Sequence, residues 1–165
     1  MKAKAPRSIW TNPIHFLAFG FGSGASPIMP GTCGTLVAIP LYWCLAQTNW
    51  WLYGAITAAA FVIGIWLCGV AAKDTGVHDH PGIVWDEFVG FWLTMFLVPL
   101  TWYWIVAGFV LFRLFDIVKP WPIKWLDAKV KGGFGIMIDD VLAAVYAWLI
   151  LQALVYGKIV LMAHG

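Results

Sequence analysis

The sequence has few charged residues. Only 11% of its 165 residues are Asp, Glu, Lys or Arg, and 62% are hydrophobic; a typical soluble domain carries about 25% charged residues. This composition excludes a soluble domain whose surface faces mainly water. The net charge is +2 and no dense basic arm is present, which excludes nucleic-acid binding. The three cysteines show no paired spacing, so neither a zinc site nor a disulfide framework is predicted.

Long apolar runs are what the sequence does contain. We expect one domain over residues 1–165, an all-α fold, and a small polytopic membrane helical bundle of about five membrane helices. Residues 34–47 are short for a hydrocarbon core of about 30 Å, and residues 13–21 are expected to form an interfacial or re-entrant segment. The five predicted spans are residues 34–47, 50–72, 84–100, 102–118 and 136–156.

The charged residues fall on one side of this predicted topology. Basic residues precede the first span, follow the second and follow the fourth, whereas the two opposite loops carry no charge. The positive-inside rule makes the charged side the cytoplasm. All eight acidic residues gather there too, and only Lys158 departs from the arrangement. The basic residues concerned are Lys2, Lys4, Arg7, Lys73, Lys119, Lys124, Lys129 and Lys131.

Five acids, Asp86, Glu87, Asp116, Asp139 and Asp140, lie at the cytoplasmic ends of three predicted spans. Ionisable groups within spans are costly and usually face a bundle interior or a water cavity. Close carboxylates repel one another, and a divalent cation with oxygen ligands removes that conflict. We therefore predict a site for Mg²⁺, with Mn²⁺ as a substitute. Ion pairs that tie helix ends to the interface are the structural alternative, and a small cation or proton transporter is the functional one.

A glycine-rich stretch over residues 20–35 is the second candidate site. Its backbone N–H groups suit a phosphate cradle at the start of the next helix, but its spacing suits a simple re-entrant turn equally well. Two histidines flank Asp79, with no third strong nitrogen or sulfur ligand nearby. Hydrogen-bonding or substrate roles are therefore preferred to zinc binding for His78 and His80.

Five segments in order then resemble the bacterial phosphatidylglycerophosphatase A family: residues 23–35, 72–80, 83–90, 112–123 and 132–140. One local departure is Thr35, where serine often follows the glycine in the family, so a hydroxyl is kept. The resemblance implies a Mg²⁺-dependent enzyme of the bacterial inner membrane, multi-pass, with its N-terminus and active site facing the cytoplasm. Its lipid substrate would be phosphatidylglycerophosphate, and its products phosphatidylglycerol and inorganic phosphate.

The resemblance also implies roles for individual residues. The catalytic candidates are Asp74, Asp86, Glu87 and Asp140. The metal candidates are Asp79, Asp86, Glu87, Asp116, Asp139 and Asp140, and the substrate-binding candidates are Ser23, Thr32, His78, Arg113 and Lys119. Physical reasoning agrees with this class of mechanism, because hydrolysis of a phosphate monoester needs neutralised charge and an aligned nucleophile.

Overall fold

The computed structural model describes residues 5–77 and 80–164, and within those ranges it contains helices and no strand. The all-α prediction is therefore confirmed. The elements are η1 (Arg7–Trp10), α1 (Pro13–Ala18), η2 (Ser23–Ala25), α2 (Pro30–Leu45), α3 (Trp50–Thr75), α4 (Trp85–Thr94), α5 (Trp102–Val118), α6 (Ile123–Lys129) and α7 (Gly132–His164). The predicted run 102–118 matches α5 at both ends, and α6 was not predicted.

Two helices, α3 with 26 residues and α7 with 33, are long and apolar enough to cross a membrane. Helices α2 and α5 are shorter, with 16 and 17 residues. At about 1.5 Å per residue they reach about 25 Å, somewhat less than a hydrocarbon core of about 30 Å. Many of their apolar side chains are exposed, as expected for helices that face lipid.

The expectation of one continuous span over residues 84–100 is wrong. Helix α4 has only 10 residues and ends at Thr94, and Leu97 then adopts a positive φ of 60° before Pro99. Hydropathy misled here because most of α4 is buried against protein. The Phe96 carbonyl beyond the helix end accepts hydrogen bonds from Trp148 Nε1 at 2.8 Å and Gln152 Nε2 at 3.0 Å. These bonds satisfy a backbone carbonyl that lies beyond the end of the helix.

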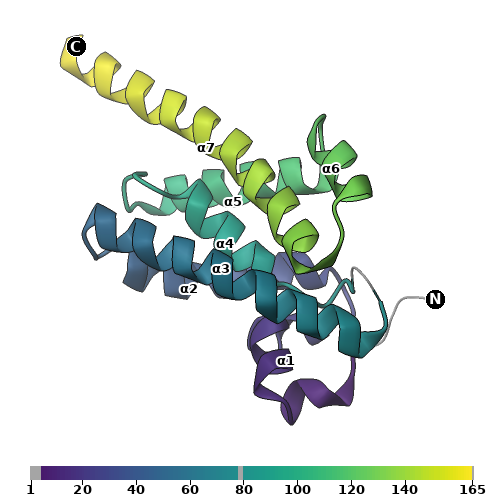
Figure 1. Cartoon of the computed structure of the whole chain (residues 1–165). Coiled ribbons are helices and arrows are strands. Elements are labelled where there is room, and N and C mark those ends of the chain that lie inside the picture. Colours follow the sequence, from purple (N-terminus) through teal and green to yellow (C-terminus); the bar gives the residue numbers. More distant parts are fainter. Residues whose placement is uncertain (1–4, 78–79, 165) are drawn as a thin grey trace.

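Helix α7 organises the fold, since it packs against α3, α4, α5 and α6. Figure 1 shows it crossing the other helices and projecting beyond them at its C-terminal end. Small residues permit the contact: a Cβ on Gly133 would collide with the carbonyl oxygen of Ile65 on α3. Ala143 and Ala147 follow Asp139 at a spacing of four residues and are fully buried on the same helix. This close packing holds the acidic N-terminal part of α7 against its neighbours.

Candidate functional site

A cavity of about 330 Å³ lies where the first turns of α2 and α4 meet the end of α5 and the first half of α7. Five carboxylates and two basic groups line it, so the acids predicted from three separate spans do come together. The lining residues that carry charge are Asp86, Glu87, Asp116, Asp139, Asp140, Arg113 and Lys119. Met29, Pro30, Gly31, Thr32, Pro81, Ile83 and Ile117 complete the wall.

Arg113 joins two of the acids. Its Nη1 donates to Glu87 Oε1 on α4 and lies 2.9 Å from Asp116 Oδ2 one turn along α5. Glu87 is only 6% exposed, and its second oxygen accepts a hydrogen bond from the Thr35 hydroxyl at 2.8 Å. The guanidinium therefore neutralises one buried and one partly buried carboxylate, and it ties α4 to α5.

Lys119 plays a comparable part at the end of α5. Its Nζ lies 2.6 Å from Asp139 Oδ2 on α7 and 3.2 Å from Asp127 Oδ2 on α6. Burial disfavours the charge on the ammonium group, but the hydrogen bonds and ion pairs to these two acids outweigh that effect and raise the pKa of Lys119. The side chain is therefore a permanent cation at the cavity wall.

Asp140 is buried, at 3% exposure, and its Oδ2 has no hydrogen-bond partner within the described ranges. Four other carboxylates, Asp116, Asp86, Glu87 and Asp139, act on it electrostatically. The Nε of Arg113 is likewise buried without a partner there. A buried carboxylate oxygen without a donor is costly, so this part of the cavity suits a cationic or proton-donating ligand.

The donor set suits a hard divalent cation, since it consists of carboxylate oxygens. In residues 5–77 and 80–164, however, no three His, Cys, Asp or Glu side chains form a ready-made metal site. Arg113 and Lys119 engage three of the five acids in ion pairs. Asp140 keeps an oxygen available, and Asp86 at the start of α4 accepts from the Glu87 N–H at 3.0 Å with Oδ1.

The first turn of α2 forms the remaining wall. Gly31 and Thr32 line the cavity, and the first N–H groups of a helix have no intrahelical partner. A Cβ on Gly31 would collide with Glu87 Oε1 and would lie 3.1 Å from both terminal nitrogens of Arg113. A glycine is therefore needed for the helix start to approach the ion pair. Ser23, in contrast, does not line the cavity, and its hydroxyl donates to the Gly20 carbonyl at 2.7 Å.

Asp74 also lies outside the cavity lining. Its Oδ2 is 2.9 Å from His15 Nε2, and His15 Nδ1 is 2.8 Å from the Ser8 hydroxyl. This chain of contacts fastens the N-terminal segment to the end of α3. His80 is buried, and its Nδ1 accepts from the Gly82 N–H at 3.0 Å, in keeping with the predicted hydrogen-bonding role. His78 and Asp79 lie outside the described residues.

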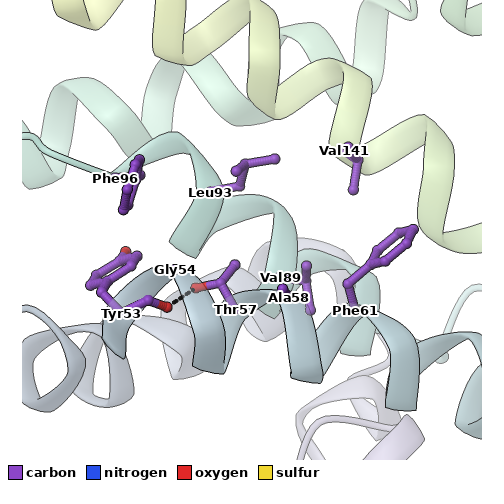
Figure 2. Close-up of a pocket in the computed structure, with 9 residues that line it drawn as sticks. All are labelled: Tyr53, Gly54, Thr57, Ala58, Phe61, Val89, Leu93, Phe96 and Val141. Atoms are coloured by element: carbon purple, nitrogen blue, oxygen red, sulfur yellow. Dashed lines mark hydrogen bonds between the residues drawn. The ribbon is translucent and has the colours of Figure 1, made fainter. Parts of the chain in front are cut away.

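A second cavity, of about 230 Å³, lies between α3, α4 and α7. Figure 2 shows its wall of Phe61, Val89, Leu93, Phe96 and Val141, with Tyr53, Gly54, Thr57 and Ala58 along α3. The Thr57 hydroxyl is not free, since it donates to the Tyr53 carbonyl at 2.9 Å. With no acid, base or histidine in its lining, this cavity cannot carry the chemistry of a phosphatase.

The chain is similar to known proteins over most of its length. The profile of the family described as phosphatidylglycerophosphatase A matches residues 16–155. A protein of Escherichia coli (strain K12) named phosphatidylglycerophosphatase A is 54% identical, over 82% of this chain and 79% of its own. A protein of the same name from Haemophilus influenzae is 50% identical, over 88% and 90%.

A third relative, from Bacteroides thetaiotaomicron, is 42% identical over 80% of this chain and 87% of its own, and its name assigns it provisionally as a phosphatidylinositol-3-phosphatase. No solved structure is a significant match. The resemblance seen in the five sequence segments is thus confirmed over most of the chain. The protein belongs to the phosphatidylglycerophosphatase A family.

Proposed function

We infer that this chain is a membrane lipid phosphatase, a phosphoric monoester hydrolase that converts phosphatidylglycerophosphate to phosphatidylglycerol and inorganic phosphate. The observation that carries this conclusion is the cavity that joins five carboxylates to Arg113 and Lys119. Two close relatives bear the name of that activity. The transporter alternative has no comparable support, because the charged residues line one cavity at the helix ends.

We propose that the terminal phosphate binds between Arg113, Lys119 and the first turn of α2. The two cations supply charge-assisted donors, and the N–H groups near Gly31 and Thr32 supply neutral ones. The Nε of Arg113, which has no hydrogen-bond partner among residues 5–77 and 80–164, offers a further donor. On the substrate's arrival, Arg113 would exchange part of its contact with Glu87 and Asp116 for contact with phosphate oxygens.

We further propose that four acids hold Mg²⁺, with Mn²⁺ as a substitute: Asp86, Asp116, Asp139 and Asp140. Glu87, which is held by its hydrogen bond from Thr35, lies beside these acids and stabilises their arrangement. The argument is the unpartnered Oδ2 of Asp140 among four other carboxylates. Such an ion supplies charge neutralisation and lowers the pKa of bound water. Asp74 has a positioning role in this scheme, because it holds the N-terminal segment through His15.

In the hydrolysis, a water oxygen forms a bond to phosphorus while the bond from phosphorus to the glycerol oxygen breaks. A carboxylate of the cavity accepts the proton of the attacking water and, as a carboxylic acid, then gives it to the glycerol oxygen, which leaves as a hydroxyl. Asp140 is the preferred base, since it lines the cavity and one of its oxygens can take the proton while the other contacts the ion. Arg113 and Lys119 stabilise the charge that develops on the phosphate oxygens.

We propose a multi-pass arrangement in the bacterial inner membrane, with the N-terminus and the cavity facing the cytoplasm. Helices α3 and α7 cross the bilayer fully, α2 and α5 cross it where it is locally thin, and α4 enters it partway. The support is the distribution of charge. Lys119, Lys124, Lys129 and Lys131 lie beside the cavity end of α5 and α7, where they also meet anionic headgroups.

The test is release of inorganic phosphate from phosphatidylglycerophosphate by the purified chain in liposomes. We expect activity with Mg²⁺ or Mn²⁺, none with EDTA, and a loss of about 100-fold or more in Asp140→Asn. Asp127→Asn is the matched control, because Asp127 also pairs with a cavity base but does not line the cavity. Full activity of Asp140→Asn, or activity that persists in EDTA, would contradict the proposal.

A further inference from the structure

The active cavity has an apolar side that the phosphate chemistry does not use. Met29 and Ile117 belong to its wall although neither can contact a phosphate favourably, and they are 57% and 62% exposed. They stand at the start of α2 and the end of α5. These two helices both pack against α4 yet barely touch each other. The cavity is therefore flanked by two helices that have α4 as a common neighbour and make few contacts with each other.

Each of these helices continues the cavity wall as an apolar stripe. On α2, Leu36, Ile39 and Trp43 follow Thr32 at the spacing of one helix face. Leu36 is 51% exposed and Trp43 is 50% exposed, so about half of each side chain is left uncovered. A helix face that begins at a charged cavity and continues as bare apolar surface suits a ligand with a charged head and apolar tails.

The stripe on α5 runs back from the cavity in the same way. Val110 and Val106 precede Arg113 and Ile117 at helical spacing, and both valines are more than half exposed. We call these side chains together the α2–α5 face: Leu36, Ile39 and Trp43 of α2 with Val106, Val110 and Ile117 of α5.

The length of the α2–α5 face is close to the depth of one leaflet of a bilayer. Eleven residues separate Thr32 from Trp43, and eleven separate Val106 from Ile117. At about 1.5 Å per residue each stripe extends about 16 Å, close to half of a hydrocarbon core of about 30 Å. One leaflet's acyl chains occupy that depth. The stripes thus match a lipid whose headgroup sits in the cavity.

We propose that the two acyl chains of the phospholipid substrate lie along the α2–α5 face while its phosphate occupies the cavity. This inference rests on the proposed function and adds to it the place of the lipid tails. Charge complementarity fixes the orientation, since Arg113 and Lys119 hold the phosphate end and the apolar stripes begin beside them. The substrate thus reaches the cavity sideways from the bilayer, between α2 and α5.

The apolar cavity between α3, α4 and α7 is the rival place for an acyl chain (Figure 2). Its lining residues Val89 and Leu93 lie on α4, and Val141 follows Asp140 on α7. A chain that ran from the charged cavity into this one would have to pass between α4 and α7. Those two helices are tightly packed, with Gly90 against Asp140 Cβ, so that path is closed.

The experiment compares two substrates in the full chain reconstituted in liposomes: long-chain phosphatidylglycerophosphate and its deacylated, water-soluble headgroup. Leu36→Trp and Val110→Trp place bulk on the α2–α5 face. We expect about tenfold lower kcat/KM for the lipid, mostly through KM, and a change of less than about twofold for the headgroup. A structural defect in the catalytic cavity would lower both alike.

Matched controls carry the same change elsewhere. Leu149→Trp on α7 and Val62→Trp on α3 alter side chains of the same type at similar exposure, 53% and 64%, away from the α2–α5 face. Ala58→Phe fills the apolar cavity of Figure 2. The inference is overturned if these controls impair the lipid reaction as much as the face variants, or if the face variants affect both substrates equally.

A second measurement does not depend on turnover. Phosphatidylglycerophosphate with a photoreactive group on one acyl chain is crosslinked to the wild-type chain, and the labelled peptides are mapped. Labelling of α2 and α5 that excess unlabelled substrate suppresses supports the inference, and suppressible labelling confined to α3 refutes it. If the wild type releases phosphate from neither substrate, the proposed function itself has failed, which is a separate result.

Discussion

The hydroxyl of Thr35 makes the sharpest energetic prediction. Thr35 is fully buried, and its Oγ1 donates to Glu87 Oε2 at 2.8 Å while Arg113 binds the other oxygen. Thr35→Val keeps the shape and removes the donor. No water can take its place, so one bond to a buried charged group is lost, worth about 1.5–3 kcal/mol. We expect kcat/KM to fall about 10- to 100-fold if Glu87 must be held for catalysis.

The assay is phosphate release from phosphatidylglycerophosphate at several Mg²⁺ concentrations, with thermal unfolding in detergent measured alongside. Thr35→Ser is the matched control, because it keeps the hydroxyl at the same position, and we expect it to retain activity within about threefold. Wild-type kcat/KM in Thr35→Val would refute the reasoning, since Glu87 would then need no donor from α2. Equal losses in both variants would also refute it, because Thr35→Ser keeps the hydroxyl that Thr35→Val removes.

Four further predictions follow from single contacts. Gly31→Ala should lower activity about tenfold or more, because its Cβ meets Glu87 and Arg113, whereas Gly157→Ala, with open space around it, should be neutral in the same assay. Lys119→Gln should raise KM for the lipid more than Lys124→Gln does, since only Lys119 lines the cavity. Asp74→Asn should lower the melting temperature with little effect on kcat, and a loss equal to that of Asp140→Asn would return Asp74 to the catalytic group. Gly133→Ala should cost about 1–3 kcal/mol in detergent unfolding, because α3 and α7 touch there; an unchanged transition would contradict that contact.

The helical class and most helix positions could be predicted because long apolar runs in a charge-poor chain favour helices that satisfy their own backbone hydrogen bonds. The limits of α5 were predicted to the residue, since Thr101 and Lys119 bound an apolar run in which Arg113 and Asp116 are the charged residues. The run 84–100 was misread for a physical reason. Hydropathy measures the side chains and not their surroundings, so a short helix buried in protein resembles one in lipid.

Some residues of the candidate site could likewise be predicted from the sequence, and others could not. Asp86, Glu87, Asp116, Asp139 and Asp140 were found because carboxylates in an apolar chain are rare and costly. Gly31 and Thr35 were missed as individual residues, since their roles come from contacts with Glu87, which lies 52 or more positions away in sequence. The Ser8, His15 and Asp74 contacts were missed for the same reason. Only the glycine-rich spacing before α2 hinted at a close backbone approach.

The ion pairs of Arg113 and Lys119 have a consequence for turnover. Without a ligand, both cations already contact carboxylates of the same cavity. A phosphate that binds there gains only the difference between its own contacts and those it displaces, and its departure restores them. Inorganic phosphate should therefore be a weak product inhibitor. The acids that surround the cations thus act as internal competitors, which keep the enzyme from being trapped by the product it makes.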